Sequence, residues 1–245
     1  MVEPLDWDTA FFGRRMGVLT GDLRSADAIA AAVTAARAGG FEYVQCRPPV
    51  DDAVAIRALT RAGFYLTDVG ATWAGSSGIS ASHEAGGHGA RLADEHDIPW
   101  LEADAVQFFR LSRFYHDPFF STADADRLHA AWIANSVRGL AAAAVWVVPD
   151  VGFVTCKLLA DGGGEVGLIG VRPGARGRGA GRALMAVALD WFRSRGIAAV
   201  RVKTQVRNLQ AMNFYHRLGF DLQSTDLTMG CVLHDAPDDH QEAAL

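Results

Sequence analysis

The second half of the chain shows two successive periodic patterns of apolar and polar residues. Apolar residues recur every three or four positions over Asp94–Phe109 and Thr122–Val137, which is helical spacing. Three runs rich in apolar and β-branched residues come next, at Leu140–Val148, Val151–Ala160 and Glu165–Val171. Because short clusters of turn residues separate these runs, we expect two helices and then three adjacent antiparallel strands.

The rest of the second half predicts a helix, a strand, a short helix and a final pair of strands. The helix takes Gly181–Ser194 with Gly196 as its C-terminal cap, the strand takes Ala198–Thr204, the short helix starts near Asn208, and the pair of strands takes Phe220–Leu233. In the first of these helices the apolar residues fall on one stripe, so we expect that face to be buried.

The first half of the chain repeats this arrangement. Gly40 and Gly196 lie 156 residues apart, and the same offset places Gly63-Phe64 on Gly219-Phe220 without a gap. Both segments predict a helix, a glycine turn, a strand, a short helix, a Gly-Phe pair and a strand. We interpret the match as structural repetition, although any two helix-strand-helix units share glycine caps and apolar periods.

A stretch of small and polar residues at 76–89 is the best candidate for a linker. The predicted domains are therefore an N-terminal α/β domain at 1–75, the linker at 76–89, a second domain at 90–234 and an acidic tail at 235–245. His83 and His88 lie in the linker without acidic or thiol company. We interpret them as solvated loop residues and predict no metal site.

The charge balance and the cysteines limit the class of protein. The chain has 245 residues, with 28 acidic side chains against 23 basic ones and a net charge of −5, so it lacks the basic excess of a nucleic-acid-binding protein. Cys46, Cys156 and Cys231 share no metal or redox spacing, which favours a reduced protein. The longest apolar run, about nine residues, is too short to cross a membrane, and no signal peptide is apparent. We expect a cytoplasmic protein with no nucleic-acid or membrane partner.

A loop rich in glycine and arginine, Arg172–Arg182, carries the clearest chemistry. It reads RPGARGRGAGR and leads from an apolar strand directly into the next predicted helix. Backbone N–H groups at a helix N-terminus attract anions, glycine lets a phosphate approach the main chain, and arginine adds positive charge. The loop therefore predicts a site for a phosphate group.

Three other interpretations fit a glycine-rich loop. A P-loop would end in Gly-Lys-Ser or Gly-Lys-Thr, but Arg182-Ala183 follows Gly181 here. A dinucleotide-binding fingerprint would place its last glycine three positions after the second, whereas Gly177, Gly179 and Gly181 are evenly spaced. The third interpretation, a flexible turn with solvated arginines, is weakened by the residues downstream.

The downstream segment Asn208–Phe220 reads NLQAMNFYHRLGF and has helical apolar spacing. Together with the Arg-x-x-Gly-x-Gly loop it resembles the GNAT family of acyl-CoA-dependent N-acetyltransferases, over roughly residues 90–233. The resemblance implies an α+β fold with a mixed, mostly antiparallel sheet flanked by helices. Two neighbouring strands would separate, with acetyl-CoA as the acyl donor between them, and the N-terminal domain would be a half-GNAT-like element.

The resemblance also assigns the residues of the acetyl-CoA site. Leu168, Ile169, Gly170 and Val171 would pair with the pantetheine arm, and their backbone N–H groups would form an oxyanion hole. The diphosphate would be held by Arg176, Gly177, Arg178, Gly179, Ala180, Gly181 and Arg182. Asn208 would lie near the cofactor, in the catalytic site. Tyr215 would lie beside the thioester sulfur as the general acid, although the residues alone also fit a core aromatic.

An acceptor amine must lose a proton before it attacks. Glu165, at the start of the same strand, is a candidate catalytic base, although a glutamate at a strand end is more often solvated. In the family, the loop between the first two helices lines the acceptor side. The candidate substrate-binding residues in that loop are Arg113, Tyr115, His116 and Asp117.

That loop, the later segment AAWIANSVRG and the opening LDWDTAFFGR are similar to the dTDP-fucosamine acetyltransferases, a group within the GNAT family. This closer resemblance implies a small-molecule amine acceptor, the 4-amino group of a dTDP-linked amino-dideoxy sugar, with Arg113 as a diphosphate partner. The sequence does not decide whether the protein forms a homodimer. The alternatives are another small-molecule amine, a protein amine, or a CoA-binding module without catalysis.

The first copy of the repeat lacks the chemical residues. At the offset of 156, Gly179, Gly181 and Tyr215 fall on Leu23, Ser25 and Leu59. We therefore predict that one acyl-CoA binds, in the second half. The first half would be a degenerate copy that completes the sheet or shapes the acceptor pocket.

Overall fold

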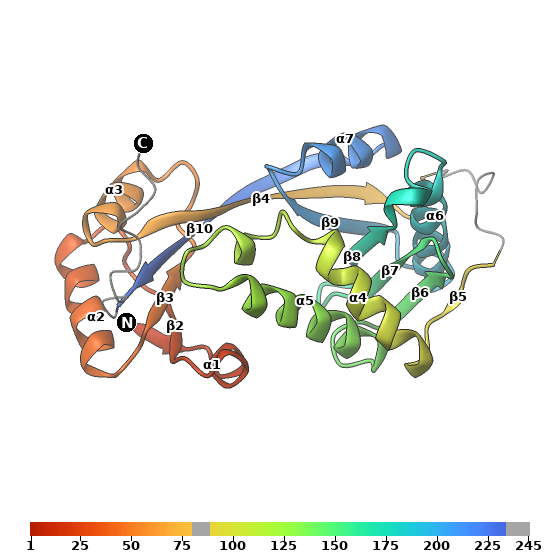
Figure 1. Cartoon of the computed structure of the whole chain (residues 1–245). Coiled ribbons are helices and arrows are strands. Elements are labelled where there is room, and N and C mark those ends of the chain that lie inside the picture. Colours follow the sequence, from red (N-terminus) through yellow and green to blue (C-terminus); the bar gives the residue numbers. More distant parts are fainter. Residues whose placement is uncertain (80–88, 234–245) are drawn as a thin grey trace, which may run out of the picture. The chain divides into compact units, whose positions relative to one another are not determined.

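A computed structural model describes residues 1–79 and 89–233 (Figure 1). Its described residues form two compact units: the first holds 1–70, 117–119 and 225–233, and the second holds most of 71–116 and all of 120–224. The greater part of the predicted linker and the whole acidic tail lie outside the described residues. Each unit is described by itself below.

The first unit is a five-stranded sheet with helices from the N-terminal part of the chain. Its elements are β1 (Val2–Pro4), α1 (Asp6–Phe12), β2 (Met16–Leu19), α2 (Ala26–Ala38), β3 (Tyr43–Cys46), α3 (Ala53–Arg61) and parts of β4 (Tyr65–Ser76) and β10 (Asp221–Val232). The strand order is β1-β2-β3-β10-β4, and β2 pairs with β3 in parallel. Apolar residues of α2, α3 and the sheet, such as Ile29, Leu59 and Val44, form its core.

The second unit has a longer strand series and helices on both faces. Its elements are β5 (Arg91–Leu92), η2 (Glu95–Asp97), α4 (Ile98–Phe108), η3 (Arg113–Tyr115), α5 (Thr122–Val137), β6 (Ala144–Val148), β7 (Gly152–Leu158), β8 (Gly164–Val171), η4 (Pro173–Ala175), α6 (Ala180–Arg193), β9 (Ala199–Gln205) and α7 (Leu209–Leu218). The strand order is β4-β9-β8-β7-β6-β5.

The helices of the second unit pack on the two faces of its sheet, and each face has its own apolar core. Helices α4 and α5, which lie side by side in Figure 1, pack with Phe153 and Val147 on one face of the sheet. Helices α6 and α7 pack with Val154 and Val166 on the other face. The predicted α+β class, with a mixed and mostly antiparallel sheet flanked by helices, is confirmed.

Most of the predicted elements of the second half are present, with one clear error. Helix α5 has the predicted bounds, and β6, β7 and β8 are adjacent and antiparallel as expected. The predicted final pair of strands is wrong, because 221–232 is one continuous strand, β10. Ser224, Thr225 and Asp226, in the middle of this segment, are residue types that also occur in turns, but the strand continues through them.

The repeated order of elements is visible in the structure. Strands β4 and β10 have twelve residues each, and their bounds differ by 156 at both ends. The glycines that close the short helices, Gly63 and Gly219, have φ values of 90° and 92°, a region that glycine adopts without strain. Each copy of the repeat therefore ends in the same turn and the same long strand.

The two copies exchange their last strands. In the first unit β3 pairs antiparallel with β10, the last strand of the second copy, and in the second unit β9 neighbours β4, the last strand of the first copy. Because β4 and β10 each contribute residues to both units, the units are discontinuous along the chain and differ from a single division near residue 75.

The described residues contain neither a membrane-spanning helix nor a cluster of metal-binding side chains. No helix in 1–79 or 89–233 is long and apolar enough to cross a membrane. In the same ranges no group of three or more His, Cys, Asp or Glu side chains is placed to hold a metal ion.

Candidate active site

Strands β8 and β9 are parallel neighbours that stay paired only at their beginnings. The register runs from Gly164 opposite Val200 to Val166 opposite Val202, while β8 continues to Val171. Among the described strands, none pairs with this edge of the second half of β8. Such an edge offers backbone N–H and C=O groups to an extended ligand.

A β-bulge lies where β8 leaves β9. Val154 is opposite Ile169 and Cys156 is opposite Val166, so β8 has one residue more than β7 in this interval. The backbone N–H of Leu168 donates to the Thr155 hydroxyl at 2.8 Å. The bulge thus redirects the backbone of β8 at the start of its free edge.

Helix α4 covers the free half of β8 closely. A Cβ added at Gly170 would lie 2.2 Å from Cδ2 of Phe108, a contact that no real Cβ makes. Glycine at 170 therefore lets the Phe108 ring lie against the strand. Leu168 packs towards the same helices, whereas Ile169 and Val171 pack towards α6.

The loop after β8 leads into α6, a helix whose N-terminus has no side-chain cap. Gly177 and Gly179 have φ values of 74° and 84°, and α6 begins at Ala180 without a side-chain hydrogen bond at its N-cap. Four other helices are capped by a side chain, from Ser25, Asp52, Ser121 and Asn208. The N–H groups of the first turn of α6 are therefore left for an anion.

The arginines of the loop differ in what they contact. Arg172 forms ion pairs with Asp104 and Asp150. Arg176 is exposed, and its Nε donates to the Val171 carbonyl at 3.0 Å.

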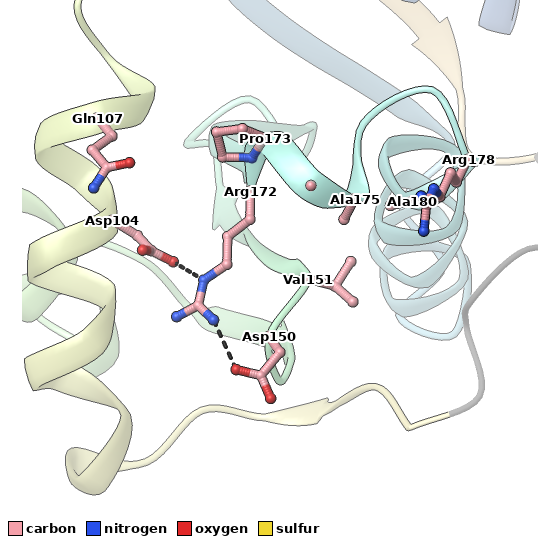
Figure 2. Close-up of a pocket in the computed structure, with 10 residues that line it drawn as sticks. Asp104, Gln107, Asp150, Val151, Arg172, Pro173, Ala175, Arg178 and Ala180 are labelled. Carbon is pink, nitrogen blue, oxygen red and sulfur yellow. Dashed lines mark hydrogen bonds and ion pairs between the residues drawn. The ribbon is translucent and has the colours of Figure 1, made fainter.

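Arg178 and Arg182 have no ion pair with any described residue, so their charges remain for a ligand. The adjoining cavity has a volume of about 540 Å³. Figure 2 shows the side chains that line it. It is lined by Asp104, Gln107, Asp150, Val151, Arg172, Pro173, Gly174, Ala175, Arg178 and Ala180.

Helix α7 meets the start of α6 at Phe214. A Cβ added at Gly181 would lie 3.4 Å from the Phe214 ring and 3.8 Å from Cγ2 of Val171. The end of β8, the start of α6 and the middle of α7 therefore converge. The structure brings the loop motif and the downstream motif together, and Tyr215 follows Phe214 in the chain.

Tyr215 is a buried phenol whose hydroxyl has no hydrogen-bond partner among the described residues. The residue is 4% exposed, and its ring lies 5.5 Å from that of Phe214 and 6.3 Å from that of Phe220. Burial raises the pKa of the phenol, so it is protonated at neutral pH. No hydrogen bond links its hydroxyl to any residue in 1–79 or 89–233. Its proton is therefore available to a ligand.

Asn208 and Glu165 have contacts of their own. The Asn208 Oδ1 accepts the Ala211 N–H at 3.1 Å and caps α7, while its amide nitrogen has no partner among the described residues. Glu165 lies in the paired part of β8, and its carboxylate forms an ion pair of 3.2 Å with Lys157 on β7. The Lys157 ammonium therefore occupies the side of the carboxylate at Oε1.

The candidate substrate residues of the second unit do not form one cluster. The Tyr115 hydroxyl donates to Asp126 at 2.7 Å, and burial, with Asp126, raises the pKa of the phenol. His116 is exposed. The Arg113 guanidinium lies 4.2 Å from the Phe114 ring, and its buried Nη1 has no partner among the described residues. Of the three, Arg113 has the donor that most clearly lacks an acceptor.

Asp117, the fourth candidate, has a structural task in the first unit. Its carboxylate accepts the hydroxyls of Tyr43 at 2.5 Å and Tyr65 at 2.7 Å, and it is 2% exposed. The Phe119 N–H also donates to it, and Arg14 donates to the Phe119 carbonyl at 2.7 Å. Its oxygens are occupied by the protein, so the geometry gives no support to substrate binding by Asp117.

His129, which is buried on α5, was not predicted from the sequence as a candidate residue. Its ring lies between those of Phe109 and Tyr115, at 5.5 and 5.3 Å, and its Nδ1 is 2.6 Å from the Ala125 carbonyl. Burial lowers the pKa of the imidazole. The ion pairs of Arg172 with Asp104 and Asp150 were not predicted either, because no local sequence pattern indicates which distant charged residues meet.

Known proteins share this arrangement. The model of the acetyltransferase (GNAT) family matches residues 99–220. The chain is 30% identical over 234 residues to a dTDP-fucosamine acetyltransferase of Escherichia coli O6:H1, covering 91% of this chain and 95% of the relative. It is 40% identical over 78 residues to a mycothiol acetyltransferase of Streptomyces avermitilis, which is 31% of this chain and 25% of that protein.

The fold is also similar to that of a solved GCN5-related N-acetyltransferase from Sphaerobacter thermophilus. The TM-score is 0.63 at 15% identity, with 97% of this chain and 78% of that chain covered. The chain therefore belongs to the GNAT family and is an acyl-CoA-dependent N-acyltransferase whose acyl donor is acetyl-CoA.

Proposed function

We propose that this enzyme acetylates the 4-amino group of a dTDP-linked amino-dideoxy sugar. The support is the similarity to the dTDP-fucosamine acetyltransferase, which extends over 95% of that relative and so includes the N-terminal region as well as the GNAT segment. The partial similarity to mycothiol acetyltransferases covers about a third of this chain. The longer match therefore favours the nucleotide sugar.

The observation that carries the proposed chemistry is the free half of β8 beside an uncapped helix start. The pantetheine arm would lie along Leu168–Val171, and the diphosphate would meet the first N–H groups of α6. Arg178 and Arg182 would add positive charge there. Acetyl-CoA supplies a thioester carbonyl for attack by the neutral amine and a thiolate leaving group.

Tyr215 would donate the proton that the leaving thiolate needs. Its raised pKa keeps the phenol protonated, and its hydroxyl has no protein partner in the described part of the chain. Phe214, its neighbour on α7, lies at the start of α6. A phenol in the middle of α7, next to Phe214 in the chain, would therefore lie near the proposed diphosphate site.

The strand would stabilise the oxygen that becomes negative during acyl transfer. The Leu168 N–H is already donated to Thr155, so the donors would be N–H groups later in β8. Glu165 remains the proposed base for the amine, acting directly or through water. Its ion pair with Lys157 would have to open or be shared for it to take a proton.

For the acceptor, Arg113 is the residue that the geometry favours. Its buried and unpartnered Nη1 is suited to a phosphate oxygen of a nucleotide diphosphate. His116 is exposed next to it in the chain, and Tyr115 would help by holding η3 in place through Asp126.

We also propose that residues 1–75 are a degenerate copy without a cofactor site and that 90–234 hold the catalytic centre. In the first copy the Ser25 hydroxyl accepts the Ala28 N–H at 3.2 Å and caps α2. A side chain thus takes the N–H group that an anion would need.

Release of free thiol from acetyl-CoA, measured side by side with several amines, tests the proposed acceptor. The panel contains a dTDP-4-amino-4,6-dideoxyhexose, the same sugar without the nucleotide, simple aliphatic amines and lysine peptides. We expect the highest kcat/KM with the nucleotide sugar and a large loss without the nucleotide. A higher kcat/KM with peptides or aliphatic amines would overturn the proposed acceptor, and thiol release with none of them would favour a binding module.

A further inference from the structure

Arg172 connects three segments of the second unit, as Figure 2 shows. Its Nε donates to Oδ2 of Asp104 on α4 at 2.6 Å, and its Nη1 donates to Oδ1 of Asp150 in the β6–β7 turn at 2.8 Å. Its backbone N–H donates to the Val151 carbonyl at 2.8 Å. The guanidinium also lies 5.0 Å from the Trp100 ring. The residue that begins the glycine-rich loop is therefore held from both sides.

The two ion pairs differ in strength. The Asp104 side chain is 13% exposed, whereas that of Asp150 is 93% exposed. Water and salt screen the exposed pair, so the pair with Asp104 is the stronger one. Asp150 adopts a positive φ of 61°, which aspartate tolerates better than most residues and which directs the turn.

Both carboxylates line the same cavity as Arg178 and Ala180, at the start of α6. Two uncompensated negative charges at this place would repel a diphosphate, because like charges at a partly screened surface interact over several ångströms. Arg172 neutralises them from within the loop. Because the Arg172 guanidinium already pairs with two carboxylates, its charge is compensated within the protein. The charges of Arg178 and Arg182 are not compensated by any described residue.

We propose that Arg172 is a positioning residue for acyl-CoA. By pairing with Asp104 and Asp150 it fixes the loop before α6 against α4 and removes the repulsion that these carboxylates would exert on the diphosphate. This inference rests on the proposed function, since it assumes that the diphosphate binds at the start of α6.

The test compares acetyl-CoA binding by calorimetry, KM, kcat and melting temperature in a set of variants of the full chain. The set is Arg172→Gln, Arg172→Lys, Asp104→Asn and the double variant Arg172→Gln/Asp104→Asn. The matched control is Arg127→Gln, which removes an arginine from a surface ion pair of 2.7 Å with Asp124 on α5.

We expect Arg172→Gln to weaken acetyl-CoA binding roughly tenfold, the order expected when a like charge is uncovered near an anion. Its kcat should change little, and Arg172→Lys should recover part of the affinity. The double variant should recover most of it, because the carboxylate that repels is then gone. The loss of acetyl-CoA affinity in Arg172→Gln should also be smaller at high salt. Arg127→Gln should bind acetyl-CoA with the affinity of the wild-type protein.

Two results would overturn the proposal. One is an Arg172→Gln variant with unchanged affinity, and the other is a double variant that binds no better than Arg172→Gln, which would mean that Asp104 does not repel the diphosphate. A parallel variant, Arg178→Gln/Arg182→Gln, separates this from the proposed cradle. If it binds acetyl-CoA normally, the diphosphate site itself is wrong and both proposals fall. If it loses affinity while Arg172→Gln does not, only the role of Arg172 is wrong.

Discussion

Asp52 and Asn208 stand 156 residues apart and cap two helices in the same way. In each case Oδ1 accepts the backbone N–H of the residue three positions later, Ala55 or Ala211, at 3.1 Å. The repeat therefore conserves a cap as well as the order of elements. The two residues differ in the other atom of the side-chain terminus. Asp52 Oδ2 accepts a hydrogen bond from Arg24 Nε, whereas the Asn208 amide nitrogen has no partner among the described residues.

This difference leads to a prediction that separates the cap from the cofactor contact. Asn208→Ala should lower the free energy of unfolding by about 1 kcal/mol, the usual cost of losing an N-cap. Asn208→Asp should keep the stability, because its Oδ1 still caps α7, but raise the KM for acetyl-CoA by placing a negative charge near an anion. Urea unfolding and steady-state kinetics measure the two effects.

The control is Asp52→Ala, which removes the equivalent cap of α3. It should lower the stability and leave the KM for acetyl-CoA unchanged. An Asn208→Asp variant with normal stability and normal KM would show that Asn208 serves only as a cap.

The buried His129 predicts a pH dependence of stability. Burial lowers its pKa in the folded protein, whereas in the unfolded chain it titrates near the ordinary value of about 6.5. Below that pH the unfolded state binds a proton that the folded state does not, so stability falls as the pH decreases towards the folded pKa. Asp126 favours the charged form and Arg110 opposes it, but both contributions are smaller than that of burial.

Urea unfolding between pH 8 and pH 5 measures this contribution. The His129→Phe variant keeps an aromatic ring between Phe109 and Tyr115 and should show a flatter decrease of stability below pH 6.5. His96→Gln, which removes an exposed histidine, is measured in parallel. Equal slopes for the unchanged protein and His129→Phe would refute the assignment.

The contrast between the two helix starts predicts a single acyl-CoA site. Ser25 caps α2 in the first copy, whereas Gly179 leaves α6 without a side-chain cap. Calorimetric titration with acetyl-CoA should therefore give one site per chain. Two sites of similar affinity would contradict the account of the first copy as degenerate.

Two glycines with the same geometry provide a matched pair for that titration. Gly177, in the loop, and Gly40, in the first copy, both have a φ of 74° and no atom within 4 Å of an added Cβ. Alanine at either position would have to adopt this positive φ, which destabilises the folded protein by an amount on the order of 1 kcal/mol. Gly177→Ala should also weaken acetyl-CoA binding, and Gly40→Ala should not.

The sequence predicted those parts of the fold that depend on neighbouring residues. Periodicity gave the bounds of α5, and short turns gave the order of β6, β7 and β8. The offset of the repeat predicted that Gly63 and Gly219 each lie between a short helix and a strand, and the structure shows a positive φ at both. The final strand was misjudged because β10 has mixed polar and apolar residues and no clear periodicity.

The site was predictable where it depends on the backbone of one segment. The glycines marked the loop before α6, since only their conformations and lack of Cβ suit an anion cradle. Contacts between distant side chains were not predictable. Asp117 meets Tyr43 across 74 residues, and Arg172 meets Asp104 across 68. Such pairs depend on how helices pack on the sheet, which no local pattern encodes.

The Tyr215→Phe variant tests the central claim, that acyl transfer at the open half of β8 uses this phenol as its acid. The substitution keeps the buried ring and removes a hydroxyl without a partner in the described part of the protein, so folding should be unaffected. The decisive measurement is kcat together with the calorimetric Kd for acetyl-CoA. We predict a normal Kd and a fall in kcat of roughly 10²-fold or more, the usual contribution of general acid catalysis. A variant that binds acetyl-CoA normally and turns over at the full rate would contradict the account.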